Sequence, residues 1–476
     1  MSLIRQSNVP LYQQLAEQLT KLIKHGDLRI GTRLSVRKLA REHKVSKGVA
    51  ETAIEILKDE GYLKTTPRSG TFVSPNLWDL LIADKTPDWQ YYSSHGFHQG
   101  NKDIIFALNN RSSDPSKLQM SSYHFYEPDF DPYSPLSYAL SVLNSAKYLS
   151  MLTLYDKRGL PMLREAVVKH VAEYGIKTSA DNIVIFDGVY EALTNIFHSF
   201  LFHGSNIFIA GNDVITAMPS IPTLGGNIHP IAMDNEGLIT ADLHLKAARK
   251  KHCLLYINPV NHFPSGISIS AGRRRELLEE IKKTRIPVIE NDMLRDINTE
   301  VPPPLKADDE NEQIIYIGSF ANTYLSASKT AWVIAPAAIV ERMCDIKVQY
   351  HARLNTILEL LSYIMLSSGK YGNCMEKIRV KLDTRTIRVN DILFKHFSEI
   401  AFWDEKCLRY HVWLRFIPEI NTDRVFMDCP GIFFIPGSTY NDKQCLLLNS
   451  VCSSLENFET AVRRIASAAR RQIKKG

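Results

Sequence analysis

The sequence contains no apolar run long enough to cross a membrane. A spanning helix needs about 18 or more consecutive apolar residues, and none of the 476 residues lies in such a run. The start of the chain is also not followed by the apolar region of a secretory signal. We therefore expect a cytoplasmic protein without a membrane partner.

Residues that bind metals are also few and scattered. The seven cysteines lie between Cys253 and Cys452 without a metal-ligand spacing. Their odd number fits a reducing compartment, in which we expect them to be core thiols. Histidine pairs such as His95 and His98 never join a compact set with cysteine and carboxylate residues. The sequence therefore predicts no metal site.

The charge is unevenly distributed along the chain. Residues 1–75 contain 13 Lys and Arg and 7 Asp and Glu, a balance of +6 that equals the formal net charge of the whole protein. The remaining 44 basic and 44 acidic residues cancel. A basic module on a neutral body suggests a polyanionic partner for the module alone, although a solvated basic surface would show the same balance.

This basic module has the pattern of a winged helix-turn-helix. Leu11, Leu15 and Leu19 share one face of a first helix, and Ser46 is placed to cap a third. The segment T-T-P-R-S at residues 65–69 separates the two short strands that follow. The predicted helices span residues 10–25, 36–43 and 47–60, and the predicted strands span residues 62–64 and 70–73.

Four motifs in this module resemble the DNA-binding domain of the GntR family. They read P-L-Y-Q-Q, G-T-R-L-S-V-R-K-L-A, E-G-Y-L and S-G-T-F-V. In that family the recognition helix lies in the major groove of double-stranded operator DNA, and the wing reaches the minor groove or the backbone. One departure is Gly48-Val49-Ala50, which stands where the family has x-Thr-Val and therefore lacks the threonine hydroxyl that contacts a phosphate in the family. The resemblance implies DNA contacts at Arg33, Ser35, Arg37, Ser46, Lys47, Arg68 and Gly70.

The rest of the chain alternates helical and strand patterns. This alternation, over more than 150 residues, predicts a mainly parallel sheet covered by helices on both faces. We expect a DNA-binding domain at residues 1–75, a linker at residues 76–122 and a large α/β domain at residues 123–476. Trp78 and Trp89 indicate that part of the linker packs down.

Residues 316–336, YIGSFANTYLSASKTAWVIAP, connect two apolar runs by a loop of small hydroxylated residues. Together with Y-D-K-R-G-L-P at residues 155–161 and F-P-S-G at residues 263–266, this stretch resembles the fold-type I aminotransferases and their variant in MocR-like regulators of the GntR family. The implied fold is α/β, with a mainly parallel sheet and a smaller C-terminal α+β subdomain. In the family, a lysine of this loop forms a Schiff base with pyridoxal phosphate.

The resemblance fails at the residues that the chemistry needs. Asn322 stands at the place of the lysine, and an amide cannot form the aldimine. Asn291 stands at the place of the acid beside the pyridine nitrogen, although a shift of one residue would put Asp292 there. Met293 replaces the tyrosine that bonds the ring hydroxyl. Leu447 replaces the arginine that binds the substrate carboxylate. We therefore expect no catalytic residues and no transamination.

The phosphate-binding side of the loop is retained. Gly188 begins a helix, Ser319 ends a strand, and Lys329 stands at the place of the family's phosphate-binding arginine. With Asn291 and Asn322, these residues form a degenerate cofactor site. It is compatible with non-covalent binding of pyridoxal phosphate or a related phosphate, or with a pocket that has been emptied.

The sequence thus favours a bacterial transcription regulator of the MocR type that forms a homodimer and can sense a small-molecule effector. The alternatives are a pyridoxal phosphate-dependent aminotransferase-like enzyme with a DNA-binding appendage, and a large domain that serves only for dimerisation or docking. A basic run near the C-terminus, which includes Arg463, Arg464, Arg470 and Arg471, is either a solvated helix end or a second nucleic-acid contact.

Overall fold

In a computed structural model the chain divides into an N-terminal unit, Met1–Asp114, and a C-terminal unit, Pro115–Gly476. The boundaries that we predicted at residues 75 and 122 remain predictions. None of the described helices is long and apolar enough to span a membrane. The structure describes residues 9–24, 27–67, 69–75, 103–121, 130, 133–213, 218, 220–298, 300–320, 329–350 and 355–473.

The N-terminal unit contains the three predicted helices and a small antiparallel sheet. Buried apolar residues such as Leu15, Leu39 and Leu57 join the helices in one core. The sheet has three strands, with β3 between β1 and β2. The two-residue strand β1 was not predicted from the sequence. The elements are α1 (Leu11–Lys24), β1 (Arg33–Leu34), α2 (Val36–Glu42), α3 (Lys47–Asp59), β2 (Leu63–Thr66), β3 (Gly70–Val73) and α6 (Asp103–Ser112).

The C-terminal unit is built on a seven-stranded sheet in the order β5-β13-β12-β11-β10-β6-β7. β13 is antiparallel to both of its neighbours, and the other adjacent strands are parallel. The sheet is therefore mostly parallel, as expected from the alternating pattern. Its strands are β5 (Ile183–Phe186), β6 (Asn206–Ala210), β7 (Asn227–Ile231), β10 (Cys253–Ile257), β11 (Val288–Asn291), β12 (Ile314–Ser319) and β13 (Ala331–Ile334).

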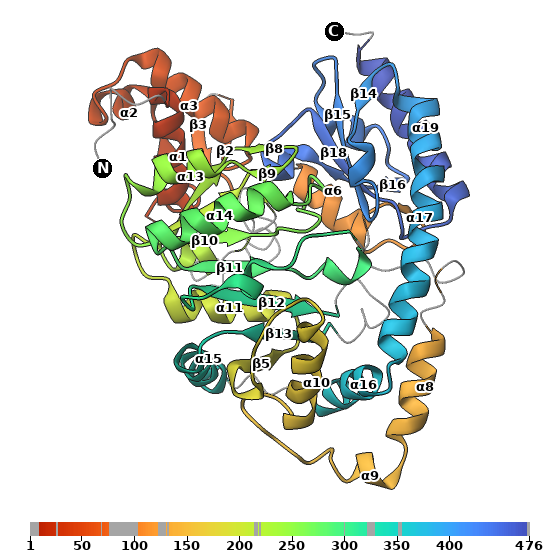
Figure 1. Cartoon of the computed structure of the whole chain (residues 1–476). Helices are drawn as coiled ribbons and strands as arrows, with labels where there is room; N and C mark the ends of the chain where they lie inside the picture. The colour runs from red at the N-terminus through yellow and green to blue at the C-terminus, as the bar shows by residue number, and fades with distance from the viewer. Residues whose placement is uncertain are drawn as a thin grey trace, which may run out of the picture. The chain divides into compact units, whose positions relative to one another are not determined.

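Helices cover both faces of this sheet (Figure 1). Alternate residues of a strand point to opposite faces. Val184 accordingly packs with α11 (Val189–Phe200) and α15 (Ala337–Gln349), whereas Ile185 packs on the opposite face. Apolar side chains on both faces explain why these strands read as continuous apolar runs. The helices of the opposite face are α10 (Pro161–Ala172), α13 (Thr240–Ala247), α14 (Ala271–Thr284) and α16 (Thr356–Ser367).

The long helix α17 (Lys370–Phe397) runs from α16 to a second sheet near the C-terminus (Figure 1). That sheet has the strand order β14-β15-β18-β17 and, with α17 and α19, forms the smaller α+β part. The remaining elements of this part are β14 (Ala401–Phe402), β15 (His411–Phe416), α18 (Thr422–Met427), β16 (Ile432–Phe433), β17 (Ile435–Pro436), β18 (Cys445–Asn449) and α19 (Leu455–Ile473). Before the large sheet stand β4 (Leu118–Gln119), α8 (Tyr133–Leu143) and α9 (Ala146–Leu149), and within it α12 (Ser220–Thr223), β8 (Met233–Asp234) and β9 (Gly237–Leu238).

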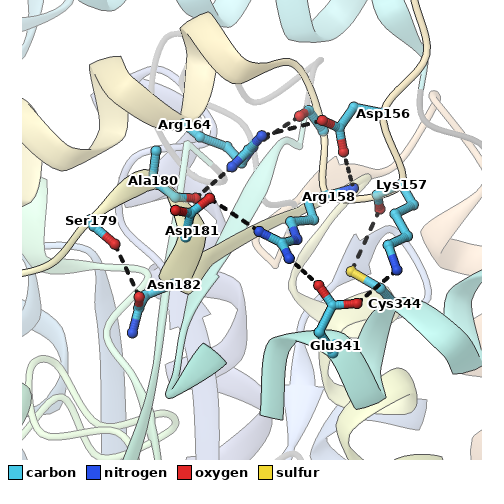
Figure 2. A network of polar contacts seen from close by, with 11 residues as sticks. Asp156, Lys157, Arg158, Arg164, Ser179, Ala180, Asp181, Asn182, Glu341 and Cys344 are labelled. Carbon is cyan, nitrogen blue, oxygen red and sulfur yellow. Dashed lines mark hydrogen bonds and ion pairs between the residues drawn. The ribbon is translucent and has the colours of Figure 1, made fainter. Parts of the chain in front are cut away.

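A polar network involves charged residues of the segment 155–164 (Figure 2). Arg164 donates to the carbonyl of Ala180 at 2.6 Å and pairs with Asp156 at 3.2 Å. Arg158 pairs with Asp181 at 3.2 Å and with Glu341, which also pairs with Lys157 at 2.7 Å. These hydrogen bonds lower the pKa of Glu341. Residues 156–164 are thus bound to the residues just before β5 and to α15.

Candidate functional sites

The first candidate site is the helix-turn-helix surface of the N-terminal unit. Ser46 caps α3, because its Oγ accepts a hydrogen bond from the Val49 amide at 3.3 Å. The hydroxyl of Ser46 keeps its own proton for donation to an acceptor. Arg37 on α2 and Lys47 at the start of α3 are both exposed. The turn therefore presents a hydroxyl and cations of the kind that bind phosphate.

The ion pairs on this surface are weak competitors for a phosphate. Lys47 Nζ lies 3.2 Å from the Glu51 carboxylate, and these side chains are 66% and 50% exposed. Exposed pairs of this type contribute about 0–1 kcal/mol and are screened by salt. Ser35 precedes α2 without forming a side-chain cap, and its side chain is exposed. Both Lys47 and Ser35 are thus accessible to a ligand.

The structure brings two further predicted residues together at the wing. Gly70 has a φ of +120°, and a Cβ added there would lie 2.8 Å from Arg33 Nε. The pairing of β1 with β3 produces this contact, since Arg33 lies opposite Phe72. Glycine at position 70 therefore leaves room for the Arg33 guanidinium. Arg68, the third basic residue predicted here, lies outside the described residues.

The second candidate site lies in the C-terminal unit, where parallel strands of the large sheet end. In open α/β sheets, ligands bind at this edge. Asn291 ends β11, Ser319 ends β12, and Gly188 precedes α11. We call this region the sheet-edge pocket. Asn322, which we predicted as part of it, lies outside the described residues.

On the phosphate side of the sheet-edge pocket, Gly188 and Lys329 lie next to each other. A Cβ added at Gly188, whose φ is +144°, would lie 3.5 Å from the carbonyl oxygen of Lys329. Lys329 also has a positive φ, +49°, and is exposed. Ser319 Oγ donates to the Thr330 carbonyl at 3.0 Å, so its proton holds the backbone that follows the loop. A cation and a helix N-terminus therefore meet here, but the Ser319 hydroxyl is already engaged.

The ring side of the sheet-edge pocket presents an amide. Asn291 is buried, and its Nδ2 donates to the Tyr256 hydroxyl at 2.9 Å. The Asn291 Oδ1 atom is buried, and it has no hydrogen-bond partner among the described residues. Burial is the main reason why the pKa of Tyr256 is well above its usual value, so the phenol stays neutral. At this point the site offers the amide oxygen of Asn291, and the charge of the buried Asp213 carboxylate also raises the pKa of Tyr256.

The alternative that Asp292 takes the place of the ring acid is not favoured by the geometry. Asp292 is buried and bound to Arg295, and it accepts a hydrogen bond from the Tyr316 hydroxyl at 3.3 Å. Tyr316 packs with α10 and α16, whereas Tyr256 packs with α11 on the other face of the sheet. Of the two neighbours, Asn291 is therefore the one beside the α11 face and the phosphate side.

Glu290, one residue earlier on β11, is occupied by the backbone. Its carboxylate accepts hydrogen bonds from the amides of Leu305 and Lys306 at 2.7 and 2.8 Å. Burial, followed by the nearby charge of Asp292, raises the pKa of Glu290 to about 8. The Glu290 carboxylate therefore binds the backbone at residues 305 and 306, whereas Asn291 binds the Tyr256 hydroxyl.

An apolar cluster stands where the family binds the substrate carboxylate. Leu447 on β18 is buried against Phe263 and Tyr440, and Trp413 packs on the same group. His411 lies beside Phe263, with ring centroids 5.1 Å apart. Burial lowers the pKa of His411 to about 4, so this imidazole is neutral at physiological pH. The cluster supplies no cation that could hold a carboxylate.

These residues do not fit pyridoxal phosphate as a catalytic cofactor. The phosphate side matches an anion, but Asn291 is an amide tied to Tyr256, and Leu447 lies in the apolar cluster. Among the described residues, neither Asn291 nor the apolar cluster around Leu447 provides the acid or the cation that would tune the cofactor and hold an amino acid. We therefore derive no reaction step. Among the described residues, no group of three or more metal-ligating side chains could hold a metal ion.

Tyr256 is a pocket residue that the sequence analysis missed. It lies in the middle of β10 and is fully buried. Because residues two apart in a strand point to the same face, the position of Asn258 could have indicated that Tyr256 lies on that face as well. The contact with Asn291 joins positions 35 residues apart, which only the parallel pairing of β10 and β11 reveals.

Comparisons with known proteins match each unit separately and the chain as a whole. Residues 11–73 match the family "Bacterial regulatory proteins, gntR family". The HTH-type transcriptional regulator YdfD of Bacillus subtilis is 28% identical over 466 residues, which cover 96% of each chain. The HTH-type transcriptional regulator NorG of Staphylococcus aureus is 27% identical over 443 residues, 90% of this chain and 98% of that protein.

Solved structures identify the fold of the large unit. A multiple substrate aminotransferase from Thermococcus profundus superposes with a TM-score of 0.72 at 20% identity, covering 79% of this chain and 96% of the other. Kynurenine aminotransferase from Pyrococcus horikoshii gives a TM-score of 0.70 at 20% identity, covering 78% and 94%. At this identity the likeness shows the fold alone. The chain therefore has the MocR-like architecture, a gntR-family helix-turn-helix domain joined to a domain with the fold of the fold-type I aminotransferases.

Proposed function

We propose that this chain is a DNA-binding transcription regulator of the GntR/MocR type whose aminotransferase-like domain is catalytically inactive. The observation that carries the proposal is the gntR-family match at residues 11–73. It is supported by relatives that are named as transcriptional regulators and that align with this chain over nearly their whole length. As a regulator, the protein acts in the bacterial cytoplasm.

The N-terminal unit binds operator DNA through α3 and the wing. Exposed Arg37 and Lys47 neutralise backbone phosphates, and the Ser46 hydroxyl donates to one of them. Arg33, whose guanidinium lies beside Gly70, supplies a further cation at the wing. Ser35 and Arg68 complete the predicted contact set.

The C-terminal unit provides dimerisation and can bind a small effector without covalent chemistry. Gly188 and Lys329 form an anion-binding edge, and the Asn291 oxygen, which has no partner among the described residues, accepts a hydrogen bond from a ligand N–H or O–H. Ser319 precedes the loop that follows β12, and Asn322 belongs to that loop in the sequence. A phosphate-bearing molecule with a hydrogen-bond donor, including pyridoxal phosphate bound non-covalently, matches this combination.

An exposed apolar group supports a homodimer. Leu154 and Tyr155 are 48% and 58% exposed, and Ile357 is 45% exposed. Leu154 and the start of α16 are adjacent, because Thr356 Oγ1 donates to the Leu154 carbonyl at 3.4 Å. We call Leu154, Tyr155 and Ile357 the 154–357 patch. Burial against a second copy would remove this apolar surface from water and pair two DNA-binding units.

One experiment separates the regulator from an enzyme with a DNA-binding appendage. The full chain is titrated with pyridoxal phosphate while the visible absorption is followed, and is then assayed with amino acids and 2-oxo acids. A regulator gives no aldimine band and no turnover, but it enriches a common motif from a random duplex library. A stable aldimine band with turnover would instead establish the enzyme.

A further inference from the structure

A groove of about 380 Å³ lies between α19 and the segment that follows α18. It shares no lining residue with the sheet-edge pocket described above. Its walls include the turn Asp428, Cys429, Pro430 and Gly431 on one side and the exposed face of α19 on the other. The lining residues are Asp428, Cys429, Pro430, Gly431, Ile432, Arg463, Arg464, Ser467 and Arg471.

Helical spacing places the basic residues of α19 on the groove. Arg463, Ser467 and Arg471 follow one another at intervals of four and therefore form one stripe. A guanidinium nitrogen of Arg464 lies 3.7 Å from the position of a Cβ added at Gly431. The opposite face of α19 is buried through Phe458, Val462 and other apolar residues, which fixes the stripe outward.

The three guanidinium groups have no anionic partner. Among the described residues, no ion pair or hydrogen bond is formed by the side chains of Arg463, Arg464 and Arg471. Arg470 on the same helix differs, because it donates to the His396 carbonyl at 2.9 Å and lies 3.8 Å from Glu399. Three arginines against the single carboxylate of Asp428 leave the groove with an excess of positive charge.

The helix dipole does not account for this arrangement. The dipole favours cations only within the last turn of a helix. Arg471 is in the last turn, but Arg463 and Arg464 lie near the middle of the 19-residue helix. Placing three like charges around one groove is unfavourable unless an anion offsets them. Guanidinium groups bind phosphate in a bidentate manner, which makes phosphate the best-matched anion.

We propose that this groove binds a small phosphate monoester that also carries a hydroxyl or amine group. The arginines of α19 hold the phosphate, and Asp428 accepts a hydrogen bond from the second group. A small molecule fits better than a DNA backbone, because the volume of the groove lies within the range of ligand pockets. The carboxylate of Asp428 would also repel a continuous polyanion.

The test measures binding of glycerol 3-phosphate and inorganic phosphate to the full chain by calorimetry at constant ionic strength. The groove variant is Arg463→Gln/Arg471→Gln, and the matched control is Arg342→Gln/Arg388→Gln, which removes the same charge from exposed positions on α15 and α17. We expect saturable binding of glycerol 3-phosphate, at least tenfold weaker in the groove variant and unchanged in the control. Ser467→Glu, which places a carboxylate between Arg463 and Arg471, should weaken binding as well without removing either arginine.

Two results would overturn the proposal. One is glycerol 3-phosphate binding that does not depend on the groove. In that case either the wild type, the groove variant and Ser467→Glu bind equally, or the wild type shows no saturable binding. The other is a loss of affinity for duplex DNA in the groove variant while glycerol 3-phosphate binding is retained, since that would assign the arginines to nucleic acid.

Discussion

The two candidate sites, one in each unit, use their polar side chains in opposite ways. On the N-terminal unit, Arg37 and Lys47 are exposed, and the ion pair of Lys47 is weak. In the C-terminal unit, Asn291 is buried and bound to Tyr256, and Ser319 is bound to its own loop. A surface that binds a partner keeps its polar groups in solvent, whereas at the second site the Asn291 amide N–H and the Ser319 hydroxyl proton are already engaged within the protein. The predictions below test this contrast.

The largest effect is expected at the exposed cations. Replacing Arg37 and Lys47 together by alanine should weaken DNA binding at least 100-fold, because two charge-assisted hydrogen bonds of about 1.5–3 kcal/mol each would be lost. The dependence of log K on log salt should become shallower by about 2, one for each lost phosphate contact. Fluorescence anisotropy over a range of salt concentrations measures both quantities.

Lys58→Ala is the matched control for this variant. It removes a charge from the last turn of α3, where Lys58 pairs with Glu55 at 2.7 Å. We expect DNA affinity close to that of the wild type. Unchanged affinity in Arg37→Ala/Lys47→Ala would remove this surface from the DNA interface.

The next effect concerns the apolar 154–357 patch. Leu154→Asp/Ile357→Asp should weaken dimerisation at least tenfold, because two carboxylates would have to be desolvated at the interface. Val380→Asp/Ile387→Asp changes residues on α17 that are 59% and 65% exposed, more than Leu154 and Ile357, and should leave the dimer intact. Sedimentation equilibrium distinguishes them, and a dimer that persists in the first variant would place the interface elsewhere.

Because Glu359 of the C-terminal unit is buried, we expect the stability of the protein to depend on pH through this carboxyl group. This carboxylate is 4% exposed and accepts a hydrogen bond from the Leu160 amide at 2.6 Å. Burial raises the pKa of Glu359 to about 7 from 4.5. The folded state thus binds the proton more tightly, and the contribution of Glu359 to stability decreases as the pH rises from 4.5 through 7.

The variant Glu359→Gln removes this penalty. It should be more stable than the wild type by about 1–3 kcal/mol at pH 8 and of equal stability near pH 4.5, as measured by urea unfolding. Glu376→Gln, whose side chain is 68% exposed, should show no such pH dependence. A stability difference for Glu359→Gln that does not change with pH would contradict the assigned pKa.

The smallest effect is expected from restoring the lysine. Asn322→Lys alone should produce no measurable transamination, because the Asn291 amide and the apolar cluster around Leu447 remain. Amino donor and 2-oxo acid pairs assayed with pyridoxal phosphate test this expectation. Turnover in the single variant would show that Asn291 and Leu447 matter less than proposed here.

Much of the fold could be predicted because its signals are local. Apolar residues at helical spacing and the Ser46 cap indicated the three N-terminal helices, and continuous apolar runs indicated strands buried on both faces. β1 was missed, since its two residues, Arg33 and Leu34, are too few to show a period. Its pairing with β3 depends on a tertiary contact.

The site was less predictable because its geometry depends on contacts between distant residues. The sequence identified Asn291 and Leu447 as departures from the family pattern, but not the Tyr256 hydroxyl that binds Asn291 or the aromatic residues around Leu447. The sequence also left Asn291 and Asp292 as alternatives. The bond between Asp292 and Arg295 and the packing of Tyr316 distinguish them, and both require the fold.

The most direct test of the central claim is selection from a random duplex library by the full chain without pyridoxal phosphate, in parallel with Arg37→Ala/Lys47→Ala. A DNA-binding regulator with an inactive aminotransferase-like domain predicts enrichment of a common motif by the wild type and its loss in the variant. Failure of the wild type to enrich any motif, or equal enrichment by both proteins, would contradict the account.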